Sequence, residues 1–113
     1  MALPPRPSEL EVQAEVQTCY NHEDDELALS CIKELAAELR GQADVCAPRV
    51  VMLTRDGCAP CAEEKRLRQD DIASGAIEVV EITTPRGAAI AQKNEIDWTP
   101  AVLVLDCHEA VIE

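Results

Sequence analysis

Two cysteines separated by two residues are the part of this chain whose side chains could do covalent chemistry. They belong to a Cys-Ala-Pro-Cys motif at residues 58–61, which follows an apolar run at 50–54 and the strand-breaking pair Asp56-Gly57. The segment that follows the motif is rich in charged residues and contains neither Gly nor Pro before Gly75. This order predicts a strand, a tight turn and a helix that begins at Cys58. A Cys-x-x-Cys motif in that position is typical of thiol–disulfide exchange.

Such exchange needs a thiolate, because the anionic sulfur rather than the thiol attacks a disulfide. At the N-cap of its helix, Cys58 would meet unpaired backbone N–H groups and the positive end of the helix dipole, and both stabilise an anion. Pro60 lacks an N–H group and therefore suits the first turn. We predict that Cys58 attacks a substrate disulfide and that Cys61, one turn further along, resolves the mixed disulfide.

Charged residues of both signs lie next to this motif. Glu63 and Glu64 oppose a thiolate, whereas Arg55 and Lys65 favour it. From the sequence, the sign of the local potential stays open.

A metal site is the alternative interpretation of the same cysteine pair. A strong zinc site needs a second Cys-x-x-Cys pair, and the four other cysteines are not spaced in that way. Two further combinations, Cys19-x-x-His22 and Cys107-His108, each offer only one pair of ligands in a loop. We therefore predict redox chemistry without a bound metal or cofactor. The alternative function is a soft-metal chaperone of ferredoxin-like fold, whose Gly-x-Cys-x-x-Cys motif after a strand the segment Thr-Arg-Asp-Gly-Cys at 54–58 resembles loosely.

The remaining cysteines have no predicted catalytic role. Cys31 lies on the apolar stripe of an expected helix and is predicted to be a core residue, with a Cys19–Cys31 disulfide as the alternative. We predict no function for Cys46 and Cys107. The first residues lack the basic start and apolar core of a signal peptide, which predicts a cytoplasmic protein. Thiols are mostly reduced there, so we do not expect six cysteines to form a full disulfide framework.

Composition narrows the classes of partner. The 113 residues carry a net charge of −12, which argues against nucleic acid and against anionic membrane surfaces. No apolar run approaches the roughly 18 residues of a transmembrane helix. Residues 1–8 hold three prolines and predict a disordered lead-in, and residues 9–113 predict a single domain.

The other segments predict strands and helices in alternation. Expected strands cover residues 10–16, 50–54, 77–82, 101–105 and 110–112, and expected helices cover 26–40, 58 to the turn at 74–75, and 84–94. Residues 10–16 alternate apolar and polar side chains, which favours a strand, although their Glu, Ala and Gln content would also suit a helix. The order β-α-β-α-β-α-β-β predicts an α/β fold with parallel pairing and an antiparallel last pair.

With the motif at 58–61 after a strand, and Thr99-Pro100 before the apolar run at 101–105, the chain resembles the thioredoxin/glutaredoxin superfamily. The resemblance implies a thioredoxin-like fold, with a central mixed sheet flanked by helices and a cis bond before Pro100 that faces the disulfide. It also implies that substrate contacts come from Ala59, Pro60, Trp98, Thr99 and Pro100. The family's C-terminal helix is missing, which leaves a homodimer open.

The function that the resemblance implies is reduction of protein disulfides by a thiol–disulfide oxidoreductase. Its partners would be disulfide-containing proteins and a thioredoxin-reductase-like or glutathione-linked reductant. The Gly-Gly-x-x-Asp segment that helps glutaredoxins hold glutathione has no counterpart, and Met52 stands in the region of the buried Asp of thioredoxins. A non-catalytic thioredoxin-like interaction module is a further alternative.

Overall fold

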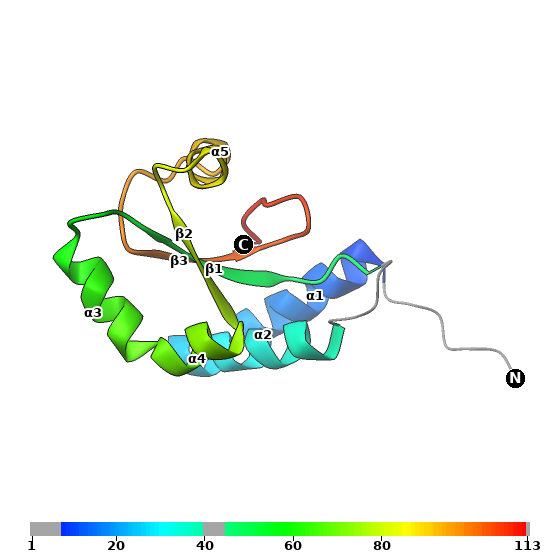
Figure 1. The fold of residues 1–113 in the computed structure, drawn as a ribbon. Helices are drawn as coiled ribbons and strands as arrows, with labels where there is room; N and C mark the ends of the chain where they lie inside the picture. The colour runs from blue at the N-terminus through cyan, green and yellow to red at the C-terminus, as the bar shows by residue number, and fades with distance from the viewer. Residues whose placement is uncertain (1–7, 40–44, 113) are drawn as a thin grey trace, which may run out of the picture. The chain divides into compact units, whose positions relative to one another are not determined.

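The structure is a computed structural model that describes residues 8–39 and 45–112. The chain divides into two compact units. The N-terminal unit comprises Met1–Pro48 with Ile112–Glu113, and the sheet unit comprises Arg49–Val111. Helices α1 and α2 belong to the former, and all strands and the other helices belong to the latter (Figure 1). The described part is a mixed α/β protein with five helices and a three-stranded mixed sheet.

Helix α1 (Glu9–Tyr20) occupies the segment for which we expected a strand. Its buried residues Val12, Val16 and Cys19 are four and three positions apart, which is a helical stripe. Leu10, which the alternating pattern grouped with them, is 77% exposed. The Ser8 hydroxyl accepts a hydrogen bond from the N–H of Glu11 at 3.2 Å and caps the helix. The alternation was therefore misleading, and the helix-forming composition was the better signal.

Helix α2 (Asp25–Leu39) agrees with the expected helix at 26–40. A disulfide joins Cys31 on this helix to Cys19 on α1, so the prediction of a plain core residue at Cys31 is wrong and its alternative is correct. In the same unit, the hydroxyl of Tyr20 donates to the carbonyl of Ile112 at 2.9 Å. All six cysteines, each within the described ranges, are disulfide-bonded, contrary to our expectation of mostly reduced thiols.

The sheet has the strand order β2-β1-β3. Strand β1 (Arg49–Thr54) pairs in parallel with β2 (Ile77–Glu81), as expected. Strand β3 (Ala101–Leu105) runs antiparallel to β1, contrary to the prediction of parallel pairing. The loop after α5 brings the chain back to the carboxyl end of β1, where Leu53 pairs with Ala101. The expected strand at 110–112 is reduced to one antiparallel bridge between Leu105 and Val111.

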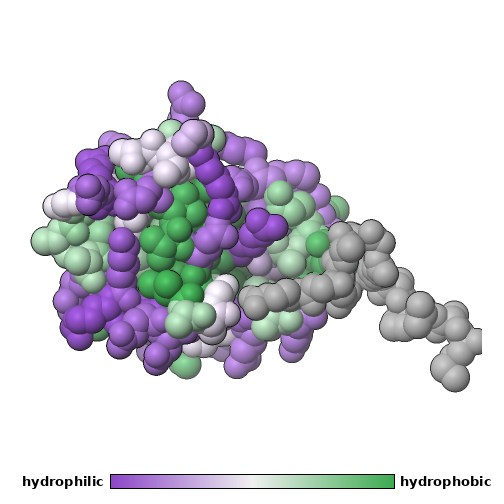
Figure 2. Space-filling model, viewed as in Figure 1, coloured by the Kyte–Doolittle hydropathy of each residue, from purple (hydrophilic) through white to green (hydrophobic). Residues whose placement is uncertain are grey.

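Both faces of β1 are buried. Val51 and Leu53 belong to one apolar cluster, together with Val80, Ile90, Ala91, Ile96, Ala101, Leu103 and Leu105. The alternate residues Val50, Met52 and Thr54 point to the opposite face and are also buried. Apolar side chains are visible over the sheet in Figure 2, with hydrophilic side chains around them.

Some helices of the sheet unit begin or end at residues that commonly cap helices. Helix α3 (Ala59–Leu67) follows the Cys58 turn, but the expected long helix breaks at Arg68, after which α4 (Gln69–Ser74) runs to Gly75. Helix α5 (Pro85–Lys93) confirms the expected helix, with Thr84 as its N-cap. None of the helices in the described ranges is long and apolar enough to span a bilayer.

Candidate functional site

The local structure at residues 54–61 confirms the predicted order of strand, tight turn and helix. Gly57 has a φ of 75°, a left-handed conformation that favours glycine, and the N–H of Cys58 donates to the carbonyl of Arg55 at 3.3 Å. Cys58 then has extended dihedral angles and occupies the N-cap of α3. The motif therefore places one sulfur at the first turn of a helix, where backbone N–H groups are unpaired.

Cys58 and Cys61 form a disulfide, with their Cα atoms 5.2 Å apart. The Sγ atom of Cys58 also accepts a hydrogen bond from the N–H of Cys61 at 3.1 Å. Cys58 is half-buried, whereas Cys61 is only 1% exposed. A reactant from solvent can therefore reach Cys58, while the second sulfur is shielded beneath it.

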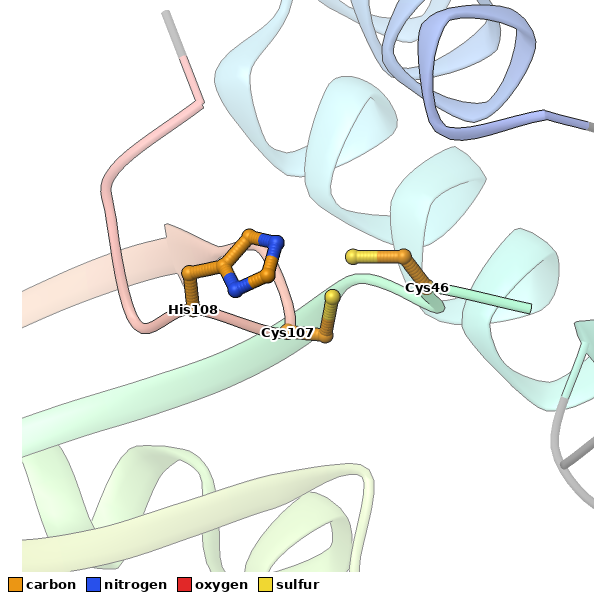
Figure 3. A group of neighbouring side chains, drawn as sticks. All are labelled: Cys46, Cys107 and His108. Atoms are coloured by element: carbon orange, nitrogen blue, oxygen red, sulfur yellow. The ribbon is translucent and has the colours of Figure 1, made fainter. Parts of the chain in front are cut away.

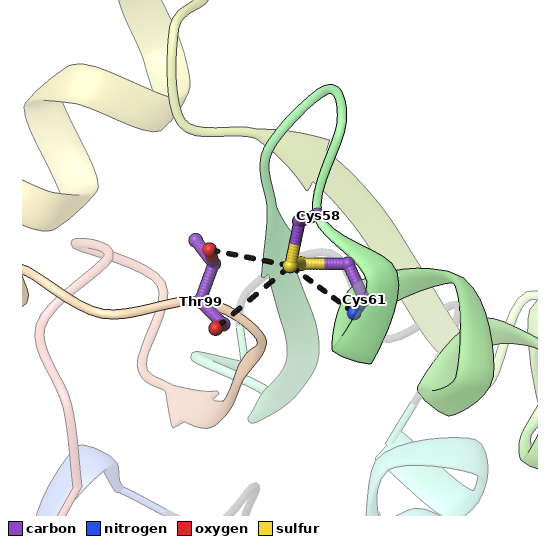
Figure 4. Close-up of a disulfide and its surroundings, with 3 residues drawn as sticks. All are labelled: Cys58, Cys61 and Thr99. Atoms are coloured by element: carbon purple, nitrogen blue, oxygen red, sulfur yellow. Dashed lines mark hydrogen bonds between the residues drawn. A yellow bond between two sulfur atoms is a disulfide. The ribbon is translucent and has the colours of Figure 1, made fainter.

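The loop that precedes β3 lies against this disulfide (Figure 4). The hydroxyl of Thr99 donates to Sγ of Cys58 at 3.6 Å, and the carbonyl oxygen of Thr99 lies 3.9 Å from the same sulfur. The Thr99–Pro100 peptide bond is cis, which confirms the prediction. Residues 58 and 99, far apart in sequence, are thus neighbours in the fold.

The other residues that we predicted to contact substrate are exposed at the surface near the disulfide. Ala59 and Pro60 form the first turn of α3 and are exposed. Trp98, just before Thr99, is 54% exposed. Its role as a substrate contact stays a prediction.

A groove of about 370 Å³ opens beside the two cysteines. It is lined by Arg55, Asp56, Gly57, Cys58, Ala59, Cys61, Ala62, Lys65 and Glu81. Both cations that we expected to favour a thiolate are in this lining. Glu81, at the end of β2, is a groove residue that the sequence analysis did not single out.

The two acids that we expected to oppose a thiolate are engaged elsewhere. Glu63 pairs with Arg66 at 2.5 Å, and Glu64 pairs with Arg68 at 2.6 Å. The hydrogen bond to Glu63 raises the pKa of Arg66 above its usual value. Neither carboxylate is in the groove lining, which holds Arg55 and Lys65 together with Asp56 and Glu81.

Thr54, the last residue of β1, is a second residue that the sequence analysis missed. It is fully buried, and its Oγ1 atom has no hydrogen-bond partner among the described residues. A buried hydroxyl in that state is uncommon and costly, so its presence beside the disulfide turn calls for an explanation. The only sequence signal was a polar residue at the end of an otherwise apolar strand.

Two of the remaining cysteines lie in connecting segments (Figure 3). Cys107 and His108 are on the exposed loop after β3, and Cys46 is in the segment before β1. Both cysteines are disulfide-bonded, so neither offers a thiolate in this structure. Comparison of the chain with protein-family models and with curated proteins finds no match.

Proposed function

We propose that this protein is a thiol–disulfide oxidoreductase, with a thioredoxin-like fold, that reduces disulfides in other proteins through Cys58 and Cys61. The observation that carries the proposal is the disulfide between an accessible cysteine at the start of α3 and a shielded one a turn further on. The Thr99 loop beside the accessible sulfur adds a backbone segment against which a substrate chain can lie. No cofactor is needed, because the disulfide itself carries the two electrons.

The first step begins from the reduced protein. The Cys58 thiolate attacks one sulfur of a substrate disulfide, a new bond forms between Cys58 and that sulfur, and the other substrate sulfur leaves as a thiolate that takes a proton from water. Backbone N–H groups at the first turn of α3 stabilise the attacking anion, because Sγ of Cys58 already accepts from the N–H of Cys61.

The second step releases the substrate. Cys61 loses its proton and attacks Sγ of Cys58, the mixed disulfide breaks, and the second substrate sulfur leaves and is protonated. Overall, two electrons pass from the dithiol to the substrate, and the Cys58–Cys61 disulfide seen in the structure is the product. A thioredoxin-reductase-like or glutathione-linked reductant would restore the dithiol.

The soft-metal chaperone has less support. It predicts a βαββαβ order, whereas the sheet unit has the order β1-α3-α4-β2-α5-β3. The chaperone hypothesis also assigns no role to Thr99, whose hydroxyl donates a hydrogen bond to the sulfur of Cys58. A non-catalytic interaction module would have the same fold, so only a measurement of disulfide reduction distinguishes it from the proposed oxidoreductase.

Reduction of insulin by the pre-reduced protein tests the proposal. Cys58→Ser should abolish turnover, because serine is a far weaker nucleophile. Cys61→Ser should lose turnover but accumulate a covalent mixed disulfide with the substrate, detectable by mass spectrometry. Ala73→Ser, at an exposed position of α4, is the matched control and should behave like the unmodified protein. Equal insulin reduction by Cys58→Ser and the unmodified protein would refute the proposal.

A further inference from the structure

In the disulfide form of the protein, the hydroxyl of Thr54 has no hydrogen-bond partner within residues 8–39 and 45–112. Thr54 is 0% exposed, so bulk solvent does not reach this hydroxyl. An aliphatic residue of the same shape, such as valine, would avoid the cost of this group entirely. The presence of a hydroxyl here therefore points to a partner that exists in a different state of the protein.

The register of the sheet puts Thr54 beside Glu81, a residue that lines the groove together with Cys61. Its neighbour Leu53 belongs to the apolar cluster with Ile90 of α5, so Thr54 points to the opposite face of β1. Thr54 is paired in parallel register with Glu81, and paired residues point to the same face. Glu81 in turn lines the groove together with Cys61. Cys61 is also buried, and it is not part of the cluster on the α5 face.

Reduction of the disulfide creates a new polar group on this side of the sheet. When two electrons and two protons are added, the bond between the sulfurs breaks and Cys61 gains a thiol that is free to rotate. A thiol or thiolate is a better hydrogen-bond acceptor than a sulfur in a disulfide, and in the thiolate it carries a full charge. A reduced sulfur at this position can therefore accept a hydrogen bond from a buried hydroxyl donor.

We propose that Thr54 donates a hydrogen bond to the sulfur of Cys61 in the reduced protein and in the resolving step. The inference rests on the proposed function, which it deepens by naming the group that supports the second cysteine. Cys61 must become a thiolate in a place that is only 1% exposed, where a charge loses the stabilisation that water provides. The Thr54 hydroxyl replaces part of that stabilisation. The electron pair of the thiolate then forms the bond to Cys58, and the substrate sulfur leaves with its own pair.

The equilibrium between dithiol and disulfide is the first test. In Thr54→Val the dithiol loses its hydrogen bond, and the disulfide no longer contains an unpaired hydroxyl, so both effects favour oxidation. We expect the equilibrium constant against a glutathione buffer to shift about tenfold towards the disulfide, which corresponds to a potential about 30 mV more negative. Thr54→Ser keeps the hydroxyl and should match the unmodified protein. Thr83→Val, at an exposed position, is the matched control for the same replacement.

The two chemical steps are the second test. Thr54→Val should slow the release of substrate from a preformed mixed disulfide at Cys58, again by about tenfold if the thiolate loses one hydrogen bond. The rate at which Cys58 is alkylated by iodoacetamide should stay unchanged, because Thr54 acts on the other sulfur. A merely structural role would move neither the potential nor the ratio of the two rates. Thr54→Ala removes the hydroxyl by a different replacement and should repeat the result.

The outcomes separate this inference from the proposed function. An unchanged potential in both Thr54→Val and Thr54→Ala, or a shift towards the dithiol, would overturn the role of Thr54 even if insulin is reduced normally. Insulin reduction that does not depend on Cys58 would overturn the proposed function, whereas the glutathione equilibrium would still report on Thr54. A shift that Thr54→Ser also shows would mean that the methyl group, and not the hydroxyl, is responsible, and would overturn the inference as well.

Discussion

The disulfides Cys19–Cys31 and Cys58–Cys61 are the same covalent bond in two different settings. The former closes a separation of 12 residues and fastens α1 to α2, whereas the latter closes a separation of 3 residues at the start of α3. Each lies on a helix whose N-cap accepts a hydrogen bond from an N–H three residues further on. In α1 the acceptor is the hydroxyl of Ser8, but in α3 it is the sulfur of Cys58 itself.

The burial and hydrogen bonding of each sulfur, and not the disulfide bond itself, are what distinguish the two bridges. Cys19 is 3% exposed within a pair of helices, so its disulfide is suited to holding them together. Cys58 is half-buried, sits where N–H groups support an anion, and touches Thr99. These surroundings are the basis on which we propose a redox role for Cys58 and not for Cys19.

The largest expected effect on stability comes from removing the structural bridge. Cys19→Ala/Cys31→Ala should lower the free energy of unfolding by about 3 kcal/mol, because the unfolded chain regains the freedom of a loop of that size. Cys58→Ala/Cys61→Ala is the matched control and should cost less, because its loop is shorter. Urea denaturation followed by circular dichroism measures both. If the second pair cost more than the first, the proposed division into a structural and a redox disulfide would be wrong.

A smaller effect is expected at the helix caps. Ser8→Ala removes the acceptor for the N–H of Glu11 and should cost about 1 kcal/mol of stability. Ser8→Asp keeps an acceptor and should recover most of the loss. Alkylation of Cys58 should be the same in both variants, because α1 is capped independently of α3. A change in that rate would show that the two caps are coupled.

The smallest effect is expected from the groove cations. Arg55→Gln and Lys65→Gln each remove a positive charge from the groove beside Cys58, so less of its thiolate should be present at neutral pH. We expect iodoacetamide to react on the order of twofold more slowly in each variant at low salt, and the difference should shrink as salt is added. Arg66→Gln, whose charge is already paired with Glu63, is the matched control. An equal effect of all three replacements would mean that only the net charge matters.

The parts of the fold that depend on neighbouring residues were predictable. Asp56-Gly57 ended a strand, Pro85 stood at the first turn of α5, and Thr84 capped that helix through a hydrogen bond with Gly87 at 3.0 Å. The close approach of the Gly87 backbone to β2 was not predictable. A Cβ atom at this position would lie 1.9 Å from the carbonyl oxygen of Glu81, so only glycine fits. That contact involves a strand six positions away, and no local pattern signals it.

The failures have a common physical origin. Residues 10–16 fit both a strand and a helix, and only the burial of Val12 and Val16 on one side of α1 separates the two. The direction of β3 depends on where the loop after α5 returns to the sheet. The partner of Cys31 depends on how two helices pack, since its own helix stripe suits a core residue equally well.

By itself, the sequence determined the chemistry-bearing motif, its place between a strand and a helix, and the proline loop before the last strand, because turn residues and caps act over a few positions. Only the tertiary structure decided that Thr99 lies at the sulfur of Cys58 and that Cys61 is shielded. It also decided that the hydroxyl of Thr54 is buried with no partner in the part of the chain that the structure describes. Each of these is a relation between segments that are distant in the chain, and burial and proximity exist only after those segments pack.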